Sequence, residues 1–194
     1  MEELHSIEKI GAYLGCDPAL LAQALAWQQH WAAQGRHKRL GELLLELQLT
    51  SSDTLWAALR AQRLDRLRRC SVFTGLEAHE LDALCEVVQE RSIRAGEEFI
   101  RQDDLGDRCF IVASGHAVVF QRDGNEEVLL STVEPGECLG ELGYFSDGRR
   151  SASVRTIEDM EVLELYYTDL QRILEVTPRL AKNLRDLVTK RLRR

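Results

Sequence analysis

Proline is scarce in this chain, with only three among 194 residues. A long proline-rich linker is therefore excluded. Apolar residues are not scarce: 44% of the residues are hydrophobic and 29% are charged, which is ordinary globular usage. The composition thus excludes an intrinsically disordered chain, and the length allows one large domain or two small ones.

An excess of basic residues is also missing. Lysine and arginine number 25 against 32 aspartates and glutamates, which gives a formal net charge of -7. Proteins that bind nucleic acids in general gain most of their affinity by neutralising phosphates, so the acidic balance argues against a nucleic-acid partner. Any anionic ligand must be held by a local group of donors.

Patterns typical of disulfides, metals and export are absent too. The five cysteines have no Cys-X-X-Cys spacing and lie among apolar neighbours, which favours the reducing cytosol. His116 has no second histidine or cysteine at metal-binding spacing, so we expect no metal site. The first ten residues are acidic where a signal peptide is basic, and no apolar run approaches the roughly 20 residues that cross a bilayer. We expect a cytoplasmic chain without a membrane span.

A change of composition near residue 70 predicts two domains. Residues 1–69 are almost charge-neutral, contain all three tryptophans and have few β-branched residues, whereas residues 70–194 carry the acidic excess and are rich in Val, Ile and Gly. In the first part, Asp17 before Pro18 is typical of a helix start, and Ser51 can cap a later helix. Leucines at helical spacing predict a helical domain, with the tryptophans mostly in its core.

Six short β-rich runs follow, bounded by Gly and Asp. They predict antiparallel strands over Glu97–Ile100, Cys109–Val112, Ala117–Phe120, Glu127–Leu130, Ala152–Ile157 and Glu161–Leu165. Asp123-Gly124-Asn125 is typical of a hairpin turn, and Gly106 and Gly115 stand where a positive φ is expected. Helices from about Thr168 to Val176 and from Pro178 follow the last strand. We therefore predict an α+β fold: a small helical N-terminal domain, then a β-barrel or jelly roll with C-terminal helices.

One segment, from Gly140 to Val154, interrupts the rhythm of the strands. Its glycines permit close backbone approach, and a helical turn near Leu142 would direct free N–H groups at an oxyanion. Arg150 followed by Ser151 adds a charge and a hydroxyl donor. A phosphate-binding loop is one interpretation and a glycine-rich turn with two surface arginines is the other; composition and spacing leave both open.

The run Gly-Glu-Leu-Gly-Tyr-Phe-Ser-Asp-Gly-Arg-Arg-Ser-Ala-Ser-Val-Arg, residues 140–155, resembles the phosphate-binding cassette of cyclic nucleotide-binding domains. Such domains occur in bacterial catabolite activators, kinase regulatory subunits and ion channels. Further matches in the family's order and spacing are Phe73–Leu76, Gly96-Glu97, Phe110–Val112, Gly115, Pro135-Gly136 and Leu174–Pro178. The resemblance covers residues 70–194 and implies a domain that binds cAMP or cGMP.

The resemblance also implies a role for each matching cassette residue. Arg150 would pair with the cyclic phosphate, because a planar guanidinium offers a fork of donors, and Glu141 would accept from the ribose 2′-hydroxyl. Ser151 would add a hydroxyl donor. The remaining contacts would come from backbone amides, those of Gly140, Leu142, Ser151 and Ala152. No catalytic residue and no cofactor is implied beyond the nucleotide ligand.

Two departures from the family pattern affect these expectations. Asp103 stands where glycine is usual, a change that aspartate tolerates in the left-handed region. In the catabolite activators the last helix runs further and leads into a helix-turn-helix, whereas this sequence stops at Arg194. We therefore expect no DNA-reading element, and the preference between cAMP and cGMP stays open. Arg191 and Arg194 are candidates for stacking on the base.

The first 69 residues resemble a different family. The run from Arg39 to Leu49, with the leucines after it, resembles the N-terminal domain of type II secretion and type IV pilus assembly ATPases. Some of those domains bind cyclic di-GMP through two tandem copies of this motif. Here Gln48 replaces the usual glycine of the second copy, and the earlier copy is shortened. A helical adaptor domain is the main hypothesis, and a cyclic di-GMP responsive adaptor is the alternative.

Together these features predict a bacterial, non-catalytic, cytosolic receptor for a cyclic mononucleotide, cAMP in the first place. Binding would draw the last helices over the cassette, and the helical domain would report this closure to a protein partner of a signalling, secretion or motility system. A ligand-free interaction module that forms a homodimer through its last helix is an alternative. An enzyme is another, although no nucleophile–base pair or metal cluster can be assembled from these spacings.

Overall fold

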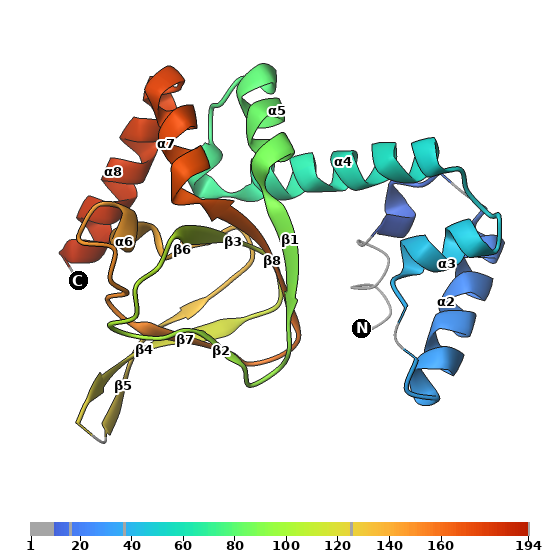
Figure 1. Cartoon of the computed structure of the whole chain (residues 1–194), viewed down its shortest axis with the longest axis horizontal. Helices are drawn as coiled ribbons and strands as arrows, with labels where there is room; N and C mark the ends of the chain where they lie inside the picture. The colour runs from blue at the N-terminus through green and yellow to red at the C-terminus, as the bar shows by residue number, and fades with distance from the viewer. Residues whose placement is uncertain (1–9, 16, 37, 125, 194) are drawn as a thin grey trace. The chain divides into compact units, whose positions relative to one another are not determined.

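The computed structural model describes residues 10–15, 17–36, 38–124 and 126–193. The chain divides into two compact units, Met1–Asp65 and Arg66–Arg194, and each is described by itself (Figure 1). The boundary lies within helix α4 (Ser52–Arg69), a few residues before the change of composition near residue 70.

The described part of the first unit is helical. Its elements before α4 are η1 (Ile10–Ala12), α2 (Pro18–Ala33) and α3 (Leu40–Glu46). The two predicted caps are confirmed: Asp17 Oδ1 accepts the Ala19 N–H at 2.8 Å, and Ser51 Oγ accepts the Thr54 N–H at 3.1 Å. Leucines of α3 and α4 form the apolar core with Ala24 of α2.

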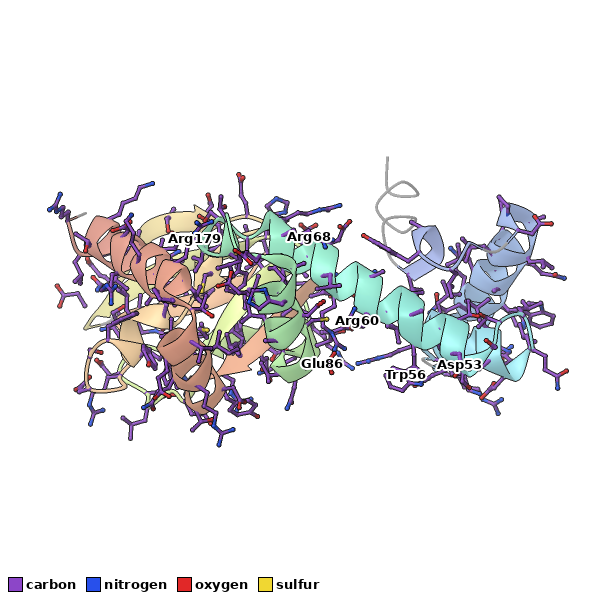
Figure 2. The ribbon with its side chains drawn as sticks, turned by 90° about the horizontal axis from the view of Figure 1, so that it is seen from above. Asp53, Trp56, Arg60, Arg68, Glu86 and Arg179 are labelled. Carbon is purple, nitrogen blue, oxygen red and sulfur yellow. The ribbon has the colours of Figure 1, made fainter. Side chains whose placement is uncertain are left out.

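The expectation that the tryptophans lie mostly in the core is wrong for two of the three. Trp56 is 68% exposed and Trp27 is 45% exposed, whereas Trp31 is partly buried against the apolar core. Helix α4 buries Leu55 and Ala58, and each step along a helix turns the side chain by about 100°. Trp56 therefore points away from the core of its unit (Figure 2).

The end of α3 holds a residue other than glycine in a left-handed conformation. Gln48 has φ 56°, its N–H donates to the Leu45 carbonyl at 3.0 Å, and the Leu49 N–H donates to the Leu44 carbonyl at 2.8 Å. These two bonds form a Schellman motif, in which glycine usually takes the left-handed position. A glutamine at this left-handed position is thus a local strain on this helix end.

Replacing Gln48 with glycine is expected to stabilise the first unit by about 1 kcal/mol, because the left-handed conformation costs a residue with a Cβ roughly that amount. Tryptophan fluorescence during denaturant unfolding measures this, since all three tryptophans lie in this unit. Gln48→Ala is the matched control and should bring no gain, because its Cβ remains. An unchanged midpoint for Gln48→Gly would contradict the prediction.

The described part of the second unit contains two antiparallel four-stranded sheets, with strand orders β1-β8-β3-β6 and β2-β7-β4-β5 (Figure 1). The strands are β1 (Gln89–Ile93), β2 (Glu98–Ile100), β3 (Arg108–Ser114), β4 (Ala117–Asp123), β5 (Glu126–Val133), β6 (Cys138–Leu139), β7 (Ser153–Thr156) and β8 (Met160–Tyr166). Their inward side chains form one apolar core that includes Ile100, Phe110 and Val162. The predicted α+β fold with an antiparallel β domain is confirmed.

Each of the six predicted strands matches an observed strand, but two strands and one helix were not predicted. Strand β1 consists mostly of polar residues and β6 is only two residues long, so neither shows a period-2 pattern. Helix α5 (Ala78–Val87) buries Leu81, Leu84 and Cys85 at helical spacing. The predicted turn residue Asn125 lies outside the described residues.

Two helices follow β8, as predicted, and pack against the rest of the unit. They are α7 (Tyr167–Val176) and α8 (Pro178–Leu192), and α8 buries Leu180 and Leu184. Asn183 of α8 donates from Nδ2 to the carbonyls of Val72 and Thr74, at 2.8 and 3.1 Å. These bonds hold α8 to η2 (Ser71–Phe73), the short helix that precedes α5.

Glu98 makes the stability of this unit depend on pH. Arg122 donates to its two carboxylate oxygens at 2.9 and 2.6 Å and, as the main cause, lowers the pKa of Glu98 from 4.5 to about 2. A depressed folded-state pKa adds stability that is present above pH 4.5 and is lost as the pH falls through about 2. In Glu98→Gln, the decrease in the free energy of unfolding over this pH range should be smaller than in the wild type by about 1 kcal/mol, after allowance for solvent screening. Urea unfolding of both proteins over that pH window measures it, and parallel curves would contradict it.

Candidate functional site

A cavity of about 490 Å³ opens in the second unit between the two sheets, the cassette and α8. Its wall contains all six cassette residues predicted to bind ligand, namely Gly140, Glu141, Leu142, Arg150, Ser151 and Ala152. Arg191 of α8 and apolar side chains such as Val119, Leu130 and Leu139 line it as well. The other predicted base contact, Arg194, lies outside the described residues.

The cassette leaves β6 through a left-handed glycine and then forms a single helical turn. Gly140 has φ 77° and precedes α6 (Glu141–Tyr144), and the Gly148 N–H donates back to the Gly143 carbonyl at 3.1 Å. The Arg150 N–H donates to the Asp104 carbonyl at 2.9 Å before the chain enters β7. These bonds hold the loop, and its Glu141 and Arg150 line one cavity.

Arg150 is a buried cation held by backbone carbonyls. The residue is only 7% exposed. Its guanidinium donates from Nη1 to the Gly140 carbonyl at 2.9 Å and from Nη2 to the Arg108 carbonyl at 2.8 Å. Nη1 also lies 3.0 Å from the hydroxyl of Tyr167. In the described part of the chain no carboxylate forms an ion pair with Arg150. A buried charge is costly without a counter-ion, so this guanidinium suits an anionic ligand.

Glycine is required at position 106 for a different structural reason from the one predicted. Its φ is not positive, so the expectation of a left-handed turn at this position is wrong. A Cβ at Gly106 would lie 2.2 Å from the Arg150 guanidinium, and one at Gly140 would lie 2.3 Å from Nη1. Glycine is needed at both positions because the arginine side chain occupies the space of a Cβ. Gly115 and Asp103 are left-handed as expected, with φ 82° and 67°.

Glu141 is a fully buried carboxylate with one free acceptor. It is 0% exposed, and its Oε1 accepts from Nη1 of Arg191 at 2.5 Å. Its Oε2 is buried and has no hydrogen-bond partner among the described residues. A buried acceptor without a donor is unfavourable, since it has lost its water and gained nothing in exchange. A ligand hydroxyl that donates to Oε2 would satisfy it.

The other predicted residues are placed less distinctly. Ser151 is exposed, and its carbonyl accepts from Nε2 of Gln121 at 3.0 Å. Arg191 contacts the Glu141 carboxylate, so its stacking on a base stays a prediction. Arg149 is exposed and donates to the Asp103 carbonyl at 2.8 Å. Of the two arginines that the turn interpretation places at the surface, only Arg149 lies there. Tyr167 could not be predicted as a site residue, because nothing in its local sequence pattern separates it from the adjacent Tyr166.

None of the described cysteines lines this cavity. The described cysteines, Cys70, Cys85, Cys109 and Cys138, are buried and form no disulfide with one another, and burial raises the pKa of the Cys70 thiol to about 12. Cys16 lies outside the described residues. No group of three His, Cys, Asp or Glu side chains in the described ranges could hold a metal ion.

Among the helices described, none is both long and apolar enough to cross a bilayer.

Comparison with known proteins agrees with this geometry. Residues 90–177 match the family described as Cyclic nucleotide-binding domain. The chain therefore contains a cyclic nucleotide-binding domain, and the sequence similarities place it with the catabolite-activator type.

Three relatives illustrate the similarity. The "Cyclic AMP receptor protein" of Thermus thermophilus is 36% identical over 123 residues, which is 63% of this chain and 57% of that protein. The N-terminal domain of a transcriptional regulator from Streptomyces coelicolor A3(2) is 32% identical, with a TM-score of 0.56 over 66% of this chain and 90% of that one. The regulatory domain of Toxoplasma gondii PKA with cAMP is 28% identical, with a TM-score of 0.55 over 59% and 44% of the two chains. The chain spans less than three fifths of the curated relative's length.

Proposed function

We propose that this protein is a non-catalytic, cytoplasmic receptor for a cyclic mononucleotide, with cAMP as its ligand. One observation carries the proposal: a single cavity contains a buried cation, Arg150, and a buried carboxylate oxygen, Glu141 Oε2, and among the described residues the first has no carboxylate partner and the second has no donor. A molecule with an anionic group and a hydroxyl satisfies both, and a ribose cyclic phosphate has the two on one rigid ring system. The names of the relatives that mention cyclic AMP support the same choice.

In the proposed complex the ligand contacts follow from the groups present. Arg150 pairs with the cyclic phosphate, and Oε2 of Glu141 accepts the ribose 2′-hydroxyl. The Ser151 hydroxyl and the amides of Gly140, Leu142 and Ala152 surround the phosphate. Arg191 holds Oε1 and so leaves Glu141 one oriented acceptor. A deoxyribose would leave that acceptor unsatisfied, so the site should select ribose.

The last helix is the part of the domain that would respond to the ligand. Near the end of α8, Arg191 contacts the carboxylate that would bind the ribose. In the first half of the helix, Leu180 and Leu184 are buried. Ligand binding should therefore favour the packed position of α8, by as much as the affinities of the packed and unpacked forms differ. Hydrogen exchange of α8 should slow when cAMP is added; equal exchange with and without cAMP would contradict the response.

We propose that residues 1–69 form a helical adaptor domain and that residues 70–194 form the nucleotide-binding domain. We also propose that a protein partner receives the signal.

Calorimetric titration of the full chain with cAMP, cGMP and cyclic di-GMP tests the proposed function. We expect a single class of sites for cAMP, with cGMP as the comparison that reports base preference. Binding of cyclic di-GMP instead would support the adaptor alternative for residues 1–69. No binding of any of the three would overturn the receptor and favour a ligand-free interaction module.

A further inference from the structure

Tyr167 connects the cassette arginine to the helix that follows the sheets. It is the first residue of α7, and its backbone N–H donates to the Asp107 carbonyl at 2.7 Å. Its hydroxyl lies 3.0 Å from Nη1 of Arg150 and donates to the carbonyl of Gly140. Gly140 O also accepts from Nη1 at 2.9 Å, so the three groups form a closed triangle of hydrogen bonds. This triangle joins Gly140 and Arg150 of the cassette to α7.

The cassette backbone is shaped around this hydroxyl. A Cβ at Gly143 would lie 2.8 Å from the Tyr167 oxygen, with its next neighbours at 3.4 Å. Gly143 does not have a positive φ, so its conformation alone does not demand glycine. The space occupied by the hydroxyl does. A glycine in the middle of α6 costs helix stability, which indicates that the close approach has a compensating value.

The protonation state of Tyr167 suits this arrangement. Burial raises its pKa to about 12, although the nearby Arg150 acts in the opposite direction. The hydroxyl therefore keeps its proton at neutral pH and can donate to Gly140 O while it accepts from Arg150. The guanidinium therefore cannot rotate without breaking the two bonds of Nη1 and the bond from Nη2 to the Arg108 carbonyl.

We propose that Tyr167 is a positioning residue for Arg150: it fixes the guanidinium for the phosphate and links the phosphate contact to α7. Tyr167 can act so only if the cassette binds a cyclic phosphate, so the inference rests on the proposed function. A residue that orients Arg150 should affect the phosphate contact and leave the ribose contact of Glu141 unchanged. A residue that only fills space should affect neither selectively.

The first test replaces the hydroxyl alone. Tyr167→Phe keeps the ring, which contacts the Tyr144 ring at a centroid distance of 5.4 Å, and should weaken cAMP binding roughly 3- to 10-fold. The preference for cAMP over 2′-deoxy-cAMP should stay as in the wild type. Tyr166→Phe is the matched control, because its ring lies against Arg108 outside the triangle, and its affinity should equal that of the wild type.

The second test uses pairs of substitutions. In an Arg150→Ala background, Tyr167→Phe should cause almost no further loss, because the hydroxyl then has no guanidinium to orient. Gly143→Ala should weaken binding through the collision with the hydroxyl, and Gly143→Ala with Tyr167→Phe should bind at least as tightly as Gly143→Ala alone.

The outcomes separate this inference from the proposed function. If the wild type binds no cyclic nucleotide, the proposed function fails. If the wild type binds cAMP and Tyr167→Phe binds it equally well, the positioning role fails and the receptor stands. Additive losses in the pairs, or a changed ribose preference in Tyr167→Phe, would also overturn the positioning role.

Discussion

Replacing Arg150 with alanine is expected to weaken cAMP binding by roughly 10- to 100-fold, because a hydrogen bond to a charged group is worth about 1.5–3 kcal/mol. The guanidinium is buried in the cavity wall and has no carboxylate partner in the described part of the chain, so the phosphate would be its counter-ion. Its removal also leaves the Gly140 and Arg108 carbonyls with fewer donors. Calorimetric titration of the variant measures the loss.

Two further substitutions define the cause of that loss. Arg149→Ala removes the adjacent exposed arginine, whose guanidinium donates to the Asp103 carbonyl, and should leave the affinity almost unchanged. Arg150→Lys keeps the charge but not the fork of donors, so it should bind between the wild type and Arg150→Ala. Equal affinities for the wild type and Arg150→Ala would remove Arg150 from the site. A loss in Arg149→Ala as large as in Arg150→Ala would point to general electrostatics.

Replacing Glu141 with glutamine is expected to abolish most of the preference for ribose. The wild type should bind cAMP roughly 10- to 100-fold more tightly than 2′-deoxy-cAMP, because the deoxy ligand leaves the buried Oε2 without a donor. In the variant Arg191 keeps the amide oxygen as its acceptor, so an uncharged NH₂ takes the place of Oε2. It cannot accept the hydroxyl proton and offers at most a neutral hydrogen bond, so the preference for cAMP should fall to roughly a few-fold. Parallel titrations of both proteins with both ligands measure the change in this ratio.

Glu137 provides the matched control for Glu141. It is a second acidic residue of the cavity wall, but its Oε2 already accepts the Glu134 N–H at 3.1 Å. Glu137→Gln should therefore keep the preference for ribose. If Glu141→Gln discriminates between the two ligands as well as the wild type does, the 2′-hydroxyl is not bound by this carboxylate.

The periodic elements of the fold could be predicted because their signal is local. Short runs of apolar and β-branched residues located β3, β4 and β8, and Pro178 marked the start of α8. Strand β1 could not be found in this way. It is mostly polar, and its Arg91 forms an ion pair with Glu164 on β8, at 3.3 Å, a pairing across 73 residues that no local pattern shows.

The exposure of a residue was harder to predict than its secondary structure. Trp56 belongs to a helix as expected, but only the packing of α4 decides which face of the helix is buried. A large aromatic residue is usually buried, and here the smaller Leu55 and Ala58 are buried instead. Gly106 is a similar case, since its need for space arises from an arginine 44 residues later in the chain.

The amino-acid sequence by itself determined the chemistry of this protein: a glycine-rich cassette with a carboxylate and a guanidinium in the order of a cyclic nucleotide-binding domain. Only the tertiary structure decided how these groups are held. It placed Arg191 on Glu141 across 50 residues and Tyr167 on Arg150 across 17 residues, and it left one oxygen of Glu141 without a donor from the residues that the structure describes. The physical reason is that residue type sets which bonds a group can form, whereas burial and long-range packing set which of those bonds remain for a ligand.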